Sequence, residues 1–144
     1  MNHRIGFLFI ILLFVATACS KETVIPQEKA PAAIREYVDK HFPDQAILQV
    51  VKDRDGLELS YDVMLEGPVK LEFNKKYEVT GIEGTAKLPD SVIPAKILGF
   101  INEKYPDSYI KSWDLDDKRQ QEVELQNGLE LVFNMNGDFL RIDS

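Results

Sequence analysis

Two stretches of this chain repeat one another, and the repeat constrains the fold more than any single motif. Residues 37–44 (YVDKHFPD) match residues 100–107 (FINEKYPD) at an offset of 63 positions. Further on, residues 69–74 (VKLEFN) match residues 129–134 (LELVFN) at an offset of 60. Matching register over most of two halves indicates duplicated structural units. A unit of this size buries little core alone, so we expect the two copies to support each other.

The expected boundaries follow from where the matches begin and end. We place the first copy at residues 30–84 and the second at residues 92–144, with a linker over residues 85–91. Ahead of them we expect a signal peptide at residues 1–18. Residues 19–29 then form a modified cysteine and a polar tether without apolar periodicity.

Each copy opens with a predicted amphipathic helix. Apolar residues recur at i, i+3 and i+4, and a proline stands near each end of the pattern. In the second copy Ser91 is a candidate N-cap. The apolar positions are Ile34, Tyr37 and Val38 in the first copy, and Ile97, Phe100 and Ile101 in the second.

Each copy then continues as strands. Apolar and polar residues alternate strictly over residues 57–65 and again over residues 69–74, which is typical of half-buried antiparallel strands. The Asn-Gly pairs at 127–128 and 136–137 favour positive φ and two-residue hairpins. The predicted fold class is α+β, with two tandem repeats that each consist of one helix followed by about four antiparallel β-strands.

The N-terminus resembles a secretory signal of the lipoprotein type. A short basic start precedes an apolar run over residues 5–15, which is too short to span a bilayer. Small residues then lead to Cys19, the only cysteine, as in a bacterial lipobox. We predict lipidation of Cys19 and an exported protein, periplasmic or on the cell surface, anchored to the outer membrane through this lipid alone. The alternative is an ordinary signal peptidase site that leaves a free thiol.

Charge and composition exclude several classes of function. The chain has 17 Lys and Arg against 24 Asp and Glu, a net charge of −7. An acidic chain without a basic patch is a poor nucleic-acid binder, so we expect no nucleic-acid partner. One cysteine excludes internal disulfides and multi-cysteine metal sites. No nucleophile elbow, zinc-binding helix or phosphate loop occurs, so we expect no catalytic residues.

We also expect no metal and no cofactor. His41 lies at a predicted helix end, where a cation is favoured by the helix dipole, and no ligand-spaced partner accompanies it. The loops at residues 53–56 and 134–138 lack a complete calcium pattern and are interpreted as hairpin turns. An acidic cluster at Asp114, Asp116 and Asp117 is either a charged rim for a partner or a solvated turn.

Tandem helix-then-hairpin copies, with Phe42-Pro43-Asp44 and Tyr105-Pro106-Asp107 closing the helices and Phe-Asn strand ends, resemble PepSY-like domains. The chain is most similar to the β-lactamase-inhibitor-like, PepSY-like lipoproteins of Bacteroides-type bacteria. The resemblance covers residues 30–144 and the signal. It implies a secreted or periplasmic α+β protein without catalytic residues, which binds a protein or peptide across a sheet face, with inhibition as one form of that binding.

Three residues are the candidate partner-binding site. Tyr109, Lys111 and Trp113 follow period-2 spacing, which would place them on one face of a strand. Amphipathic aromatic residues are favoured interface anchors. The alternative is that Trp113 fills the core between helix and sheet. The polar strand faces, Glu58, Ser60, Asp62 and Glu122, Glu124, Gln126, either continue the binding surface or are simply solvated.

The predicted function is therefore that of an exported lipoprotein, which acts as a non-catalytic module for an envelope or secreted protein or peptide. A lipoprotein that binds a small ligand or has a structural role is the second hypothesis, and an unrecognised hydrolase is the third. An enclosed apolar pocket would favour the second hypothesis. Ionisable groups converging in a cleft would favour the third.

Overall fold

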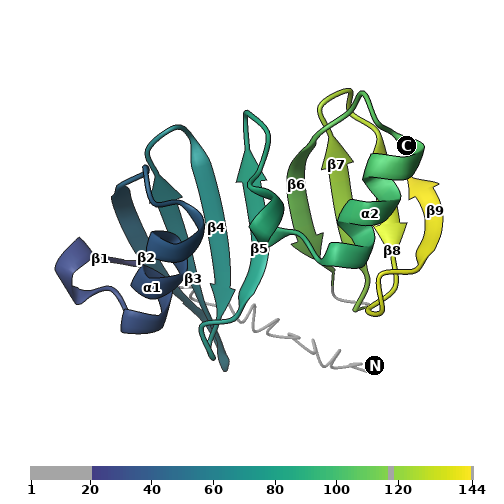
Figure 1. Cartoon of the computed structure of the whole chain (residues 1–144). Helices are drawn as coiled ribbons and strands as arrows, with labels where there is room; N and C mark the ends of the chain where they lie inside the picture. The colour runs from purple at the N-terminus through teal and green to yellow at the C-terminus, as the bar shows by residue number, and fades with distance from the viewer. Residues whose placement is uncertain (1–20, 117–118, 144) are drawn as a thin grey trace, which may run out of the picture.

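The computed structural model describes residues 21–116 and 119–143, which form two α-helices and a nine-stranded antiparallel sheet. The fold is therefore α+β. The strands follow one another in chain order across the sheet, from β1 at one edge to β9 at the other (Figure 1). The first part contains β1 (Thr23–Ile25), α1 (Ala32–His41), β2 (Ile47–Asp55), β3 (Glu58–Leu65), β4 (Val69–Asn74) and β5 (Val79–Gly84). The second contains α2 (Ala95–Lys104), β6 (Ile110–Leu115), β7 (Gln121–Leu125), β8 (Glu130–Phe133) and β9 (Phe139–Asp143).

Both helices lie against the same side of the sheet (Figure 1). Each begins directly after a proline, Pro31 or Pro94, and a single residue separates its end from another proline, so prolines flank both helices as the sequence pattern predicts. Ile34 and Val38 of α1, with their counterparts Ile97 and Ile101 of α2, are buried in one hydrophobic core. None of the described helices is long and apolar enough to cross a membrane.

Strands β5 and β6 join the two parts into one sheet. Three residue pairs connect them, and Ile82 lies opposite Trp113 on the helix-covered side. The segment expected to be a linker is packed as well, because Leu88 is buried and its amide donates to the Ile110 carbonyl at 2.9 Å. The core is therefore continuous from one end of the sheet to the other.

The segment ahead of α1 differs from expectation. Residues 23–25 form β1, which pairs antiparallel with β2, and Lys21 exchanges two backbone hydrogen bonds with Arg54. The expected tether is thus fixed along a sheet edge. No local pattern in so short a polar segment shows that a distant strand offers it a free edge.

Two further local predictions need correction. Ser91 does not cap α2. It lies in a short 3-10 turn (Asp90–Val92) and its hydroxyl is 2.9 Å from Nδ1 of His41. The Asn-Gly hairpins have the expected positive φ, 83° at Gly128 and 77° at Gly137, but their loops have three residues. In the second loop, Asn134 Oδ1 accepts the amides of residues 136 and 138, which stabilises the longer turn.

Two isoleucines that the sequence repeat places at corresponding positions supply a matched test of the β5–β6 junction. Ile82 in β5 is 1% exposed, whereas Ile142, the corresponding residue of β9, is 49% exposed. Ile82→Ala should lower the free energy of unfolding by about 2–4 kcal/mol, because a fully packed side chain is lost. Ile142→Ala should cost less than about 1 kcal/mol. Urea denaturation of dilute protein measures both, and equal losses would contradict the role of the junction.

Candidate functional site

The candidate site is the side of the sheet that the helices leave uncovered, which we call the open face. Strand register assigns each charged side chain to a face, because directly paired residues of antiparallel strands point the same way. Among the described strand residues, eleven acidic side chains lie on the open face, against three basic ones. The acidic residues are Asp53, Asp55, Glu58, Asp62, Glu72, Glu83, Asp114, Glu122, Glu124, Glu130 and Asp143; the basic ones are Lys70, Lys111 and Arg141.

Carboxylates crowd together where β4, β5 and β6 meet. Gly81 of β5 pairs with Glu72 on one side and with Asp114 on the other. A Cβ atom at position 81 would lie 2.5 Å from Asp114 Oδ1 and 3.4 Å from Glu72 Oε2. The missing side chain therefore leaves room for two carboxylates above the same strand, and a Cβ atom at this position would displace the Asp114 carboxylate.

Few cations and hydroxyls balance these carboxylates. Lys70 Nζ donates to Glu72 Oε1 at 2.6 Å and lies 3.7 Å from Asp62 Oδ1. Ser112 Oγ donates to Asp114 Oδ2 at 2.7 Å. We call these five residues the seam cluster. It carries three carboxylates and one ammonium group, so its local charge is negative.

Burial raises the pKa of two carboxylates in the seam cluster. Desolvation raises the pKa of Asp114, and the nearby carboxylates Glu72 and Glu83 raise it further, against the hydroxyl of Ser112. Desolvation also raises the pKa of Asp62, although Lys70 opposes the shift. Both charged forms are therefore poorly solvated in the folded protein. A cationic group placed over them would restore part of the lost solvation.

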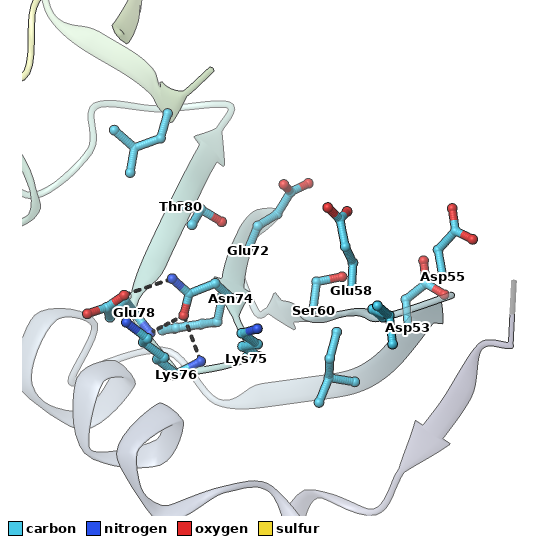
Figure 2. Close-up of a pocket in the computed structure, with 14 residues that line it drawn as sticks. Asp53, Asp55, Glu58, Ser60, Glu72, Asn74, Lys75, Lys76, Glu78 and Thr80 are labelled. Atoms are coloured by element: carbon cyan, nitrogen blue, oxygen red, sulfur yellow. Dashed lines mark hydrogen bonds between the residues drawn. The ribbon is translucent and has the colours of Figure 1, made fainter. Parts of the chain in front are cut away.

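An open hollow of about 680 Å³ lies at the end of the face formed by the β2–β3 and β4–β5 hairpins (Figure 2). Asp53, Asp55, Glu58 and Glu72 lie along its strands, and Lys75 and Lys76 come from the turn. Asn74 organises that turn: its Oδ1 accepts the amides of residues 76 and 78, and its Nδ2 donates to Glu78 Oε2. Asp53 Oδ1 is buried without a hydrogen-bond partner among the described residues. The hollow is open to solvent, and most of its lining residues are charged or polar.

The structure separates the three residues predicted to bind a partner. A bulge in β6 between Ile110 and Ser112 breaks the period-2 pattern, so the expectation of one shared exposed face is wrong. Trp113 is 6% exposed in the core, where its Nε1 donates to Gln121 Oε1 at 3.1 Å. Lys111 is on the open face, 2.6 Å from Glu124. Tyr109 precedes β6 and is half-buried; a binding role for it stays a prediction.

The other singled-out residues have structural surroundings. His41 is the last residue of α1, with its ring 4.5 Å from that of Tyr37, and burial lowers its pKa. Within residues 21–116 and 119–143, no three His, Cys, Asp or Glu side chains are grouped so that they could hold a metal ion. The loops at 53–56 and 134–138 are hairpin connections. Cys19 lies outside the described residues, as does Asp117 of the acidic cluster.

The sequence analysis missed Lys70, Glu72, Gly81 and Glu83 as parts of one site. The signal was present, because residues 69–74 alternate strictly and their polar members must share one face. A glycine inside a strand was a second signal. The contribution of Asp114 needed the β5–β6 pairing, which places Asp114 beside Gly81 although the two residues are far apart in the sequence.

Comparison with known proteins gives the family. A family model described as "Putative beta-lactamase-inhibitor-like, PepSY-like" matches residues 15–80 and again residues 59–141. The chain belongs to this PepSY-like family. The resemblance found in the sequence is thus confirmed. No curated protein sequence matches the PepSY-like chain significantly.

Three solved structures are similar to the PepSY-like chain, each with a TM-score of 0.79. A "putative periplasmic protein from DUF2874 family" of Bacteroides vulgatus is 30% identical and covers 85% of this chain and 97% of its own. A "putative calcium-regulated periplasmic protein" of Bacteroides thetaiotaomicron is 27% identical, and the alignment covers 85% of this chain and 97% of that protein. A second periplasmic protein of Bacteroides vulgatus is 29% identical and covers 86% and 100%. These descriptions support an exported location.

The raised pKa of Asp114 gives a prediction with a definite sign. An acid whose pKa is higher in the folded state destabilises the fold when ionised, and this penalty disappears as the pH falls through its folded and then its unfolded pKa. Asp114→Asn should therefore raise the free energy of unfolding at pH 7, and the gain should vanish only near pH ~3, below the unfolded pKa of aspartate. Asparagine can still accept the Ser112 hydroxyl.

Urea denaturation at both pH values measures this gain. The control is Asp39→Asn on the exposed side of α1, which makes the same chemical change and should alter stability by less than about 0.5 kcal/mol at either pH. A loss of stability for Asp114→Asn at pH 7 would show that the carboxylate is better stabilised than the geometry indicates.

Proposed function

We propose that this PepSY-like protein is a non-catalytic binding module, which takes a cationic, extended segment of an envelope or secreted protein across the open face. The observation that carries the proposal is the excess of eleven acidic over three basic side chains, counted over the described strands, on a continuous, uncovered sheet surface. Charge complementarity of this kind gives specificity and speeds association.

The shape of the face favours a polypeptide over a small molecule. A ligand-binding cavity is concave and encloses most of its ligand. The hollow at the hairpin end is open and lined mostly by charged and polar residues, with Leu57, Leu59, Phe73 and Leu115 among them. It continues into the strand surface through Glu72. A segment lying across the strands can contact both the hollow and the seam cluster. This supports a protein or peptide partner over the small-ligand hypothesis.

The arrangement of ionisable groups also supports a non-enzymatic role. The two carboxylates with raised pKa, Asp62 and Asp114, are partly buried on the open face of the sheet and do not lie together in a deep cleft. Catalytic groups usually converge within a cleft that excludes water. One structural relative is described as calcium-regulated; in this chain, we propose that divalent cations act at most by screening the face, which an assay with and without calcium would measure.

Charge reversal tests the binding face. The probe is a blocked peptide of about ten alternating lysine and valine residues, long enough to cross several strands. Glu83→Lys/Glu122→Lys places two cations beside Asp114 and should weaken binding at least about tenfold, because attraction becomes repulsion. Fluorescence anisotropy at about 0.15 M salt, where the Debye length is about 8 Å, measures the affinity.

A matched control separates the face from overall charge. Glu36→Lys/Asp39→Lys changes the net charge equally, but on the exposed side of α1. This variant should keep affinity within about threefold of the wild type. If both pairs weaken binding alike, attraction to net charge explains the result and the face has no role. A partner captured from envelope extract should show the same difference between the two variants.

Lipid anchoring is the second part of the proposal. In a Gram-negative host, Cys19→Ser in the full chain should move the protein from the membrane fraction to the soluble one and abolish labelling by palmitate, since acyl chains supply the membrane affinity. Cys19→Ser/Ser20→Cys restores a cysteine one position later and should not restore labelling. Retention of the serine variant in the membrane would contradict a lipid anchor at this residue.

A further inference from the structure

The outer edge of β9 lacks the strand neighbour that the corresponding strand of the first copy has. At offset 60, Ile142 and Asp143 correspond to Ile82 and Glu83 of β5. The outer edge of β5 is covered by β6, and that of β2 is covered by β1. Among the described strands, β9 closes the sheet with nothing beyond it (Figure 1).

This edge is unusually apolar for one that faces solvent. Phe139 is 39% exposed, Leu140 45% and Ile142 49%. Soluble proteins commonly protect such edges with lysine, proline or very short strands. Strand β9 has five residues without lysine or proline, whereas β1, the opposite edge, has three residues. By comparison, Ile82 of β5, a strand with a neighbour on both sides, is 1% exposed.

The faces of β9 are clearly divided. Ile142 pairs with buried Leu131, so it lies on the helix-covered side. Arg141 and Asp143 lie on the open face, where the guanidinium donates Nε and one terminal nitrogen to the Asp143 carboxylate at 2.9 and 2.8 Å. A cation and an anion thus stand two positions apart on one side of an edge strand.

We propose that β9 pairs antiparallel with β9 of a second copy. The two-fold axis that relates the copies passes between their two Ile142 residues, which lie opposite each other. In this register the two Ile142 side chains meet on the helix side. On the open face Arg141 of each copy lies directly opposite Asp143 of the other, twice by symmetry. Each Arg141 then stands between its own aspartate and one from the second copy.

The neighbouring registers are disfavoured by charge. Antiparallel pairing that keeps both helix layers on one side must shift by whole two-residue steps, because a one-residue shift exchanges the faces. One step in one direction places Arg141 opposite Arg141, and one step in the other places Asp143 opposite Asp143. Like charges directly opposite destabilise a strand pair. The sequence of β9 is therefore self-complementary in a single register.

The contact is short, so the association is weak. The β5–β6 junction inside the chain also has three residue pairs, which shows that so short a ladder suffices when the two strands belong to one chain. Between separate molecules the same ladder buries less than a standard interface. An isologous contact closes as a dimer and leaves no further edge at this end. This inference is independent of the open-face proposal, since either can fail alone.

The test is a charge-exchange experiment on the chain from residue 20 onward, which contains every described element. Sedimentation velocity over about 1 μM to 1 mM should show the wild type passing from monomer to dimer. Arg141→Asp alone and Asp143→Arg alone should both remain monomers, because each places like charges opposite each other. An equimolar mixture of the two should form a heterodimer, since the two carboxylates of one variant then face the two guanidinium groups of the other.

The mixture separates the interface from effects within one molecule. Each single variant loses its own Arg141–Asp143 ion pair, and mixing cannot restore that pair within either molecule. Ile142→Lys should also abolish dimers, while Leu48→Lys, at an apolar site in β2 that is 61% exposed, should not. A wild type that stays monomeric to about 1 mM, or a mixture no more associated than its components, would overturn the proposal.

A second readout uses the full exported chain. Because Cys19 is the only cysteine in the sequence, Ile142→Cys adds one defined thiol at the proposed axis. Opposed residues of an antiparallel pair are close enough for a disulfide. Non-reducing electrophoresis of envelopes should show a covalent dimer for Ile142→Cys and none for Leu48→Cys. Equal crosslinking of both variants would contradict the defined contact.

Discussion

The pairing of β5 with β6 is the contact on which the rest of the molecule depends. Each helix-and-strands part is small, and a small unit buries too little apolar surface to be stable alone. Three residue pairs join the edges of the two parts, and Ile82 and Trp113 pack under the helices at the joint. The same pairing makes the opposite side continuous, so carboxylates from β4 and β6 meet over Gly81. The core and the proposed binding face thus result from one strand junction.

At the seam cluster, the junction carries charged residues that lower the stability of the fold. Asp62 and Asp114 are partly desolvated, and their pKa values are raised because their charged forms are poorly compensated. Apolar or neutral residues at these positions would suit the fold better. Proteins often retain such local strain where a partner relieves it. The lone ammonium group of Lys70 within this cluster already lies between two carboxylates, which shows how a cation is accommodated there.

Sequence reasoning succeeded where structure is determined locally and failed where it depends on distant partners. Apolar spacing and flanking prolines predicted both helices, and alternation over residues 59–65 and 69–74 predicted which side chains are buried. The same pattern was wrong at Leu57, which lies in the turn before β3 and is 98% exposed. The bulge at Lys111 could not be anticipated, because it arises from the match of β6 to β7, and it moved Trp113 into the core. Strand β1 was missed for the same reason. The acidic face was predicted only in part. The sequence pattern showed which residues form the polar side of each strand, but it did not show which strands lie next to each other.

Strand β1 also limits how far the sheet can stand from a surface to which the N-terminus is attached. Lys21 already hydrogen-bonds to Arg54, so only two residue steps separate the sheet from Cys19. An extended chain spans about 7 Å over two residues. With a lipid on Cys19, the β1 edge would be held at the level of the headgroups. The β9 edge, eight strand spacings away, could reach up to roughly 40 Å into the aqueous space. A protein anchored in this way rotates about its β1 edge, and its β9 edge moves through the largest distance.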